Sequence, residues 1–281
     1  MLSALDARRL ELEDRELRRS LESEAGDPTL PSFPSLAGRV HPITRVMNEI
    51  THIFLGMGFA VAEGPEAETD ENNFGALNFL PDHPARDMHD TFFVKSSPLL
   101  LRTHTSPVQI REMKAGKPPL RVIAPGKVYR HEAIDATHSS VFHQVEGLVV
   151  DKGVSFADLK GTLELFVSRF FGAEVRTRLN PSYFPFVEPG AQMDISCTVC
   201  AKSKPGNGAL CPVCKGSGWL EMLGAGMVHP NVFKAVGYNP DEVSGFAFGM
   251  GVERIAMVRY GVADMRLFYG NHLDFLSQFV R

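Results

Sequence analysis

The stretch GFAFGMGVER, residues 245–254, carries the most information on the fold, because a glycine-spaced strand pattern runs directly into a helical pattern that begins near Val252. Gly249 and Gly251 have no side chains, so a flat ring can lie against the strand backbone at these positions. Arg254 falls in the first turn of the expected helix, where its planar cation can face the ring or a phosphate. Glycine-rich turns before helices are common, so on its own this stretch is only a weak indication of a phosphate site.

The composition is ordinary for a soluble globular protein, with 281 residues of which 44% are hydrophobic and 22% charged. The net charge of −4 gives no overall basic surface for nucleic acid, so any RNA contact must be local or made by another chain. No apolar run approaches the roughly 20 residues of a membrane span, and the N-terminus does not have the pattern of a signal peptide. We therefore expect a cytoplasmic protein without membrane contact.

The chain reads as an N-terminal helix (1–27), a proline-punctuated linker (28–40) and a large α+β domain (41–281). Within that domain, residues 63–98 look like a polar loop. The apolar face of a helix at 41–58 fits either a core helix or an interface with another chain. Further helices are expected from Ser106 (as N-cap) and at 155–171 and 252–260, and strands at 59–62, 120–124, 126–131, 141–150, 174–179, 191–195 and 218–223.

The expected strand 141–150 is unusual because polar side chains share a face with apolar ones. Residues two apart in a strand point to the same side, which groups Phe142, Gln144, Glu146 and Leu148. Buried polar groups need hydrogen-bond partners. The face is therefore either exposed to solvent or the floor of a site in which Glu146 balances a substrate ammonium and Gln144 accepts a hydrogen bond from it; we favour the site.

The segment YFPFVEP, residues 183–189, places Phe184 and Phe186 two positions apart on an extended backbone. Both rings can face one side, where a third aromatic ring would gain roughly 0.5–1.5 kcal/mol per pair beyond its burial. The pattern fits an ordinary core pair or a binding site for an aromatic ligand.

All four cysteines lie close together, as Cys197-x2-Cys200 and Cys211-x2-Cys214. Paired CxxC sequences of this spacing predict a tetrahedral, all-thiolate Zn²⁺ site in the hairpin between the strands at 191–195 and 218–223. A dithiol redox switch is the alternative, but it needs only one such pair. We expect the zinc to be structural rather than catalytic.

Two upstream segments change the meaning of the 245–254 stretch: HPITRVMNEITHIFLGMGFAVAEGPE (41–66) and KVYRHEAIDATHSSVFHQVEGL (127–148). Together the three segments resemble motifs 1, 2 and 3 of the class II aminoacyl-tRNA synthetases. The residues within each motif are most similar to those of the phenylalanyl-tRNA synthetase alpha subunits. The resemblance runs from about residue 29 to 279, apart from a zinc-ribbon-like insert at 197–214. It implies an α+β fold with an antiparallel sheet flanked by helices. It also makes residues 1–27 the shortened end of a helical arm that reaches tRNA.

The resemblance implies roles for individual residues. Arg130 and Arg254 become catalytic, with Arg130 bridging the α-phosphate of ATP and the carboxylate of the amino acid. Glu188 becomes a Mg²⁺ ligand shared with a beta subunit. The implied phenylalanine site is His104, Ser106, Gln144, Glu146, Phe184, Phe186, Val187, Ala225 and Ala247. The implied ATP site is Arg130, Glu132, His138, Phe142, Gly224, Gly226, Gly249, Gly251 and Arg254.

The implied reaction is ATP- and Mg²⁺-dependent activation of L-phenylalanine followed by transfer to tRNA(Phe). The family assembles as two alpha and two beta chains, and we expect the beta subunit to dock on the apolar face of the 41–58 helix. A synthetase-like paralogue for a non-tRNA acceptor or for regulation is the alternative, supported by the short arm. Another alternative is a zinc-ribbon RNA-binding or assembly protein on an inactive scaffold, against which the intact Arg130, Gln144, Glu146 and Arg254 argue.

Overall fold

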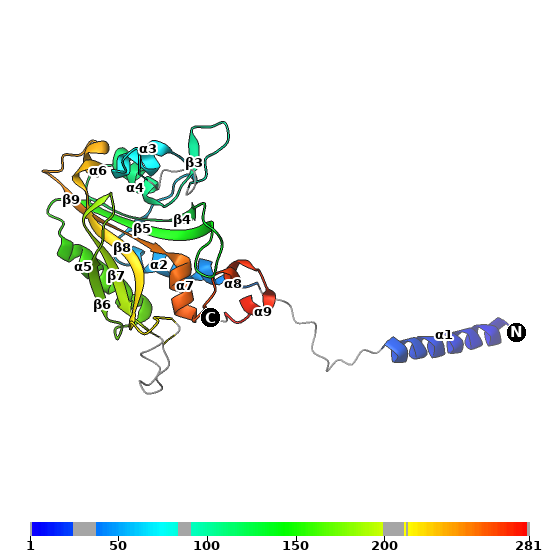
Figure 1. Cartoon of the computed structure of the whole chain (residues 1–281). Helices are drawn as coiled ribbons and strands as arrows, with labels where there is room; N and C mark the ends of the chain where they lie inside the picture. The colour runs from blue at the N-terminus through cyan, green and yellow to red at the C-terminus, as the bar shows by residue number, and fades with distance from the viewer. Residues whose placement is uncertain (1, 25–37, 84–90, 199–210, 212, 280–281) are drawn as a thin grey trace. The chain divides into compact units, whose positions relative to one another are not determined.

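The computed structural model describes residues 2–24, 38–83, 91–198, 211 and 213–279. The chain divides into two units, Met1–Arg39 and Val40–Arg281 (Figure 1). The first contains α1 (Leu2–Glu24), whose Leu10 and Leu17 are among several exposed leucines. Most of the expected linker, residues 28–37, lies outside the described residues.

A seven-stranded sheet organises the second unit, in the order β1-β4-β5-β9-β8-β7-β6. Only β1 runs parallel to its neighbour β4, and every other pair is antiparallel. The expected antiparallel sheet flanked by helices is confirmed. The strands are β1 (Ala60–Val61), β4 (Leu120–Tyr129), β5 (Val141–Asp151), β6 (Thr177–Pro181), β7 (Val187–Ser196), β8 (Trp219–Val228) and β9 (Ser244–Gly251).

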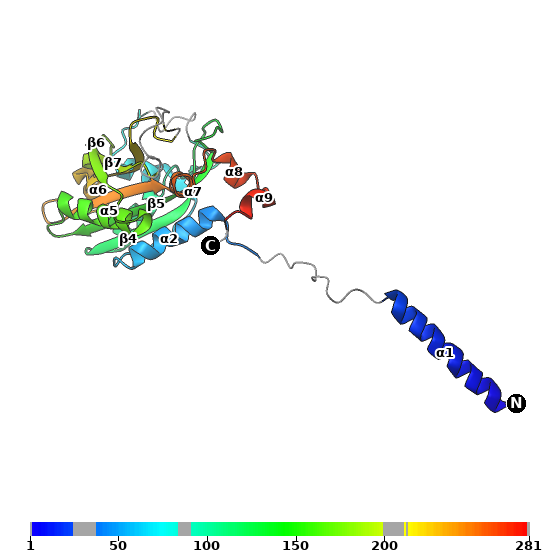
Figure 2. The same ribbon diagram turned by 90° about the horizontal axis from the view of Figure 1, so that it is seen from below.

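One face of the sheet is covered by three helices that form the larger core (Figure 2). They are α2 (Pro42–Leu55), α5 (Phe156–Phe171) and α7 (Val252–Tyr260). Phe54 of α2 lies at their centre, with its ring centroid 5.0 Å from those of Phe166 and Phe248. Much of the apolar face of α2 is used in this core, since Val46, Ile50 and Phe54 have no exposed area, whereas Met47, Ile53 and Met57 are partly buried. The expectation that a second chain docks on this helix stays a prediction.

The opposite face carries a smaller core, built under short elements that come before β4 and after β8. Its elements are β2 (Ala67–Thr69), α3 (Asp70–Asn73), the 3-10 helix η1 (Gly75–Leu77), β3 (Leu99–Leu101), α4 (Ser106–Ala115) and α6 (Pro230–Ala235). The prediction of a polar loop over 63–98 is wrong for residues 67–77. These elements are too short to show a periodicity, and tertiary contacts hold them instead: the buried Asn73 donates to Thr103 Oγ1 (3.0 Å).

Three smaller differences from the sequence predictions have local causes. Residues 120–129 are one strand rather than two, because Pro125 pairs with Val145 where β1 no longer flanks β4. There β5 is the only strand neighbour of β4, as at the sheet edges that tolerate proline. The helix α7 begins as expected but is followed by α8 (Arg266–Tyr269) and α9 (Leu273–Leu276). In the described parts of the chain, no helix combines the length and apolarity needed to cross a bilayer.

Candidate active site

A cavity of about 930 Å³ opens on the α4 side of the sheet, above the middle of β5, β9 and β8. Its floor is a ladder of neighbours across the three strands, Glu146, Gly249 and Gly224. Glycine leaves room beside Glu146, because a Cβ at residue 249 would lie 3.0 Å from Glu146 Cγ, a tight contact. The volume falls in the range of about 300–1,000 Å³ that is usual for small-molecule sites.

Glu146 lies at the bottom of this cavity and is only 6% exposed. Its carboxylate accepts hydrogen bonds from Thr105 N (3.1 Å), Gln109 Nε2 (3.3 Å) and Ser106 Oγ. Burial raises the pKa of Glu146 to about 7, although the Ser106 and Thr105 hydrogen bonds act in the opposite direction. The expectation that Ser106 is an N-cap is wrong, since Thr105 precedes the helix and the Ser106 hydroxyl is taken by Glu146.

Two polar side chains that line the cavity have buried atoms without a hydrogen-bond partner in the described part of the chain. They are Gln144 Oε1 and both ring nitrogens of His104. Burial also lowers the pKa of His104 to about 3, so the imidazole is neutral. Unpaired buried polar atoms are rare in folded proteins, and three of them in one cavity indicate a polar ligand.

The two arginines expected in the site both line the cavity. Arg130 follows β4, donates from Nε to Thr103 O (3.2 Å), and has its guanidinium carbon 5.1 Å from the centre of the Phe142 ring. Arg254 stands exposed in the first turn of α7. The adjacent Glu253 is 1% exposed, and anchors this turn to β5 by accepting from His143 Nδ1 (2.7 Å).

Glu132 and His138, expected near ATP, lie at the cavity rim in the loop between β4 and β5. His138 Nδ1 is 3.0 Å from Asp135 Oδ2. This hydrogen bond raises the pKa of His138 and lowers that of Asp135. The loop therefore favours a cationic imidazole at the mouth of the cavity.

An aromatic wall closes one side of the cavity. The rings of Phe184 and Phe186 have centroids 5.9 Å apart at an angle of 26°, so the expected pair is formed. Phe79, after η1, lies 5.9 Å from Phe186 and is nearly parallel to His104 (12°). Ala225, Ala247 and the aromatic pair line the same cavity.

Three of the expected site residues do not line the cavity. Val187 is 4% exposed and packs under Gly226, where a Cβ would lie 2.7 Å from the valine Cβ. The side chain of Glu188 is 74% exposed and faces a separate hollow of about 430 Å³. Its Oε2 is 3.2 Å from His229 Nε2. The pairing of β7 with β8 is irregular here, with a register shift between Val187 and Gly190, so the start of β7 does not continue the aromatic wall.

Sequence reasoning also missed several residues that line the cavity. Phe79 was missed because it lies in a stretch without periodicity. Gln109 and Glu253 were missed although the helical spacing of Gln109 from Ser106, and the position of Glu253 beside Arg254, could have identified them. Nothing in the sequence marks Glu221 on β8 as a cavity residue, since acidic residues are common at exposed strand positions.

The cysteine cluster lies apart from the cavity, at the β7–β8 end of the sheet. The sulfur atoms of Cys197, Cys211 and Cys214 lie within 4.8 Å of one another, with 3.9 Å between Cys197 and Cys211. Zn–S bonds of about 2.3 Å in a tetrahedron place sulfurs about 3.8 Å apart, so the cluster has the right size for a thiolate-bound metal. Lys215 adopts the left-handed region (φ 50°) that turns the backbone after Cys214. Cys200 lies outside the described residues.

Comparison with known proteins gives one consistent result. Residues 26–279 match the family model described as tRNA synthetases class II core domain (F). A phenylalanine–tRNA ligase alpha subunit from Pelobacter propionicus is 58% identical over 277 residues, covering 99% of this chain and 80% of that protein. Alpha subunits of the same name from Moorella thermoacetica (56% over 278 residues; 98% and 79% covered) and Geobacter sulfurreducens (59% over 259 residues; 92% and 74% covered) are similarly close.

Proposed function

This chain belongs to the class II aminoacyl-tRNA synthetases, among the phenylalanine–tRNA ligase alpha subunits, and we propose that it activates L-phenylalanine with ATP and transfers it to tRNA(Phe). In the first step a carboxylate oxygen of phenylalanine attacks the α-phosphorus of ATP and pyrophosphate leaves. In the second step a hydroxyl of the terminal adenosine of the tRNA attacks the activated carbonyl and AMP leaves. The names of the relatives, over nearly the whole chain, give no support to a paralogue that acts on another acceptor.

The observation that carries the proposal is the buried Glu146 carboxylate beside an unpaired Gln144 oxygen, in a cavity walled by Phe184 and Phe186. An α-ammonium supplies three N–H donors and a positive charge, which matches the two acceptors. The benzyl group of the same molecule fits against the aromatic pair. Ala225 and Ala247 then form the end of the ring pocket, with His104 and Ser106 beside the ammonium.

The adenosine and phosphates of ATP would lie at the other end of the cavity. The bare backbone at Gly249 and Gly251, with Phe142 nearby, offers a flat surface to the adenine, and Arg254 can cover its opposite face or reach a phosphate. Arg130 lies between the two ends, so its guanidinium can contact both the carboxylate and the α-phosphate. Positioning and charge stabilisation by these arginines are sufficient, and no side chain need act as an acid or base.

Magnesium is the ion expected with ATP, and it neutralises phosphate charge when bound. Glu188 offers an exposed carboxylate of the type that Mg²⁺ prefers, but one carboxylate leaves most of an octahedral shell to be filled by other ligands. We infer that Glu188 is shared with a second chain. Val187 and Gly226 act indirectly, by supporting the backbone between Glu188 and the aromatic pair.

For the cysteines we infer one structural Zn²⁺ per chain, held by Cys197, Cys211 and Cys214 with Cys200 as the fourth ligand. The cluster is buried against the larger core through Cys197 and Cys214, which gives the metal a role in stability rather than in the reaction. We also infer a cytoplasmic enzyme that works as two alpha and two beta chains.

An apolar pocket rejects tyrosine, which only adds a hydroxyl, by roughly a hundredfold at best. Accuracy therefore requires hydrolysis of tyrosyl-tRNA at another site, which we assign to the beta subunit. The test is phenylalanine-dependent exchange of pyrophosphate into ATP, together with aminoacylation, by the chain with and without its beta subunit. We expect the chain alone to have little activity and to leave tyrosyl-tRNA intact. With the beta subunit, we expect full aminoacylation and hydrolysis of tyrosyl-tRNA. Absence of phenylalanine-dependent exchange by the assembled enzyme would refute the proposed function.

A further inference from the structure

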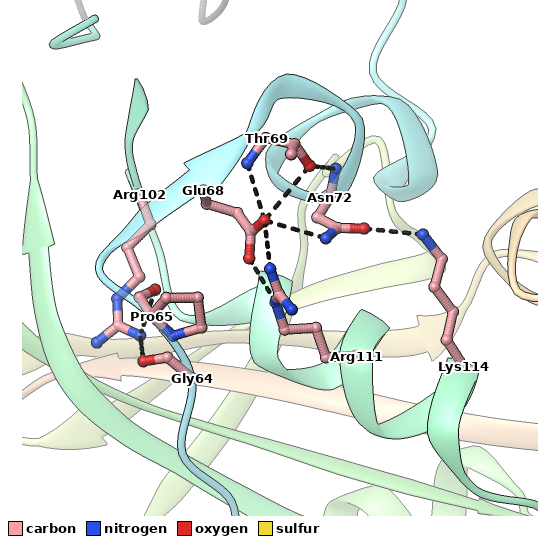
Figure 3. Close-up of polar contacts among 8 residues, drawn as sticks. All are labelled: Gly64, Pro65, Glu68, Thr69, Asn72, Arg102, Arg111 and Lys114. Atoms are coloured by element: carbon pink, nitrogen blue, oxygen red, sulfur yellow. Dashed lines mark hydrogen bonds and ion pairs between the residues drawn. The ribbon is translucent and has the colours of Figure 1, made fainter. Parts of the chain in front are cut away.

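A second buried carboxylate, Glu68 on β2, lies outside the cavity and is the centre of a polar network (Figure 3). Arg111 of α4 contacts it with two parallel hydrogen bonds, Nε to Oε2 (2.6 Å) and NH2 to Oε1 (2.8 Å). Oε1 also accepts from Thr69 N (2.8 Å) and Asn72 Nδ2 (3.0 Å). The Glu68 side chain is 1% exposed, so its charge depends on these donors.

The network joins α4 to β2 and α3 at two positions, one helical turn apart. Lys114, three residues after Arg111, donates to Asn72 Oδ1 (2.8 Å). Because residues three apart lie on the same side of a helix, both contacts hold the same face of α4 against β2 and α3. A bidentate arginine–carboxylate pair fixes orientation as well as distance. The rotation and the axial position of α4 are therefore set by residues that do not line the cavity.

The same helix carries the donors to Glu146. Ser106 and Gln109, at its first and fourth positions, both donate to the Glu146 carboxylate, and Thr105 N precedes them. Rotation or translation of α4 would move all of these donors together. Arg102, four residues before α4, donates to Gly64 O (3.1 Å; Figure 3). It also donates to Lys127 O (2.8 Å), so the segment that leads into α4 is fixed as well.

The energetics agree with a network built around a charged Glu68. Burial by itself would raise the pKa of Glu68, but the hydrogen bonds from Arg111, Thr69 N and Asn72 outweigh burial and lower it. Glu146 has the opposite balance, since burial dominates there. One buried carboxylate is thus fully paired and structural, while the other remains available to a ligand.

We propose that Glu68 and Arg111 are positioning residues for amino-acid recognition, which hold the first turn of α4 so that Glu146 presents its charge to the α-ammonium of the substrate. The inference rests on the proposed function. It assigns to this pair a larger effect on phenylalanine than on ATP, because Arg254 is carried by α7 and Arg130, which follows β4, contacts the segment before α4 only through Thr103 O.

The test uses the assembled enzyme and compares two arginine variants, Arg111→Gln and Arg178→Gln. Arg178 is a comparable control: its Nε and NH2 both donate to Asp194 Oδ2 (3.0 and 2.8 Å), and its side chain is 44% exposed, as is that of Arg111. It lies on β6, outside the cavity. Both variants leave a buried carboxylate without its arginine, so both should lower Tm by a similar amount.

In pyrophosphate exchange, Arg111→Gln should raise KM for phenylalanine about tenfold and leave KM for ATP within about twofold, because small misplacements of contact groups have effects of this order. Arg178→Gln should leave both KM values within about twofold. Arg111→Lys, which keeps the charge but loses the bidentate contact, should fall between the parent and Arg111→Gln.

Equal increases in both KM values, no change in either, or a selective phenylalanine effect in Arg178→Gln would overturn the proposal. If Arg111→Gln does not fold, the same comparison is made with Arg111→Lys and with Glu68→Gln, which keeps the size and an acceptor of the glutamate. A parent enzyme without phenylalanine-dependent exchange would instead refute the proposed function, and this inference with it. An active parent with unaltered phenylalanine KM in the variants would refute the inference alone.

Discussion

Phenylalanine binding should depend steeply on pH through one residue, Glu146. Burial raises the pKa of this carboxyl from the ordinary 4.5 to about 7. In the proposed function it pairs with the substrate ammonium, and for this it must be ionised. With a pKa near 7, about nine-tenths of the carboxyl groups are ionised at pH 8 and about one-tenth at pH 6. KM for phenylalanine should therefore rise about tenfold between pH 8 and pH 6, and phenylalanine binding near pH 6.5 should release a proton.

The same shift makes an opposite prediction for the stability of the free enzyme. A carboxyl whose pKa is raised by folding binds more protons in the folded than in the unfolded state. Its contribution to stability is fully present below pH 4.5 and is lost as the pH rises through about 7. The size of this contribution is about 3 kcal/mol. Glu146→Gln should remove it, together with the pH dependence of phenylalanine binding.

The assay is pyrophosphate exchange at saturating ATP from pH 6 to pH 8, with calorimetric titration of phenylalanine in buffers of different ionisation enthalpy to count protons. His104 does not interfere, because its pKa is about 3. Glu146→Gln should raise KM for phenylalanine at pH 8 by roughly 10- to 100-fold, the range expected for loss of charged hydrogen bonds, with KM for ATP little changed. The reasoning is refuted if the parent shows the same phenylalanine KM at pH 6 and pH 8, or if the variant keeps the parent slope.

Three further substitutions test other parts of the structure. Ala247→Gly should enlarge the end of the ring pocket and admit para-chlorophenylalanine, and an exchange rate no higher than the parent's would contradict the pocket assignment. Cys211→Ser should lower the bound zinc below one atom per chain and reduce Tm by several degrees, so unchanged metal content and Tm would count against the zinc site. Gly224→Ala places a Cβ 2.8 Å from Phe184 Cζ and should raise KM for phenylalanine about tenfold by displacing that ring. Its control is Gly161→Ala in α5, where a Cβ meets nothing within 4 Å; this change should stabilise the protein by about 0.5–1 kcal/mol without altering KM.

The parts of the site that could be predicted from sequence are those fixed by local geometry. Alternation along a strand placed Gln144 and Glu146 on one face, and the structure has both in the same cavity. The glycine-spaced strand before Val252 ends where the helix begins, as the pattern indicates. Phe184 and Phe186 form the expected pair, because side chains two residues apart on an extended backbone face the same side whatever the rest of the fold.

The parts that could not be predicted depend on contacts between distant segments. Phe79 reaches the cavity only because α3 and η1 fold back over α4, and their few residues carry no periodic signal. Glu68 is similar: its partner Arg111 is 43 positions away in the sequence. Glu188 was assigned to the site from a resemblance, and the start of β7 turns it to a different hollow.

The polar atoms left unpaired in the cavity explain how one site can be specific for an aromatic amino acid. Leaving a buried donor or acceptor unpaired costs about 1–3 kcal/mol. Gln144 Oε1 has no partner in the described residues, and burial raises the pKa of Glu146 to about 7, which disfavours its charged form. A ligand that offers only a ring would bring no donor to the Gln144 oxygen or to the Glu146 carboxylate. A ligand with only an ammonium would leave the Phe184–Phe186 wall exposed to water. A molecule that carries both groups at the right spacing satisfies the acceptors and buries the wall at once, so the free energy lost in folding the empty site is recovered on binding. The cavity is therefore less stable than it could be when empty, and in the proposed function that deficit would favour phenylalanine.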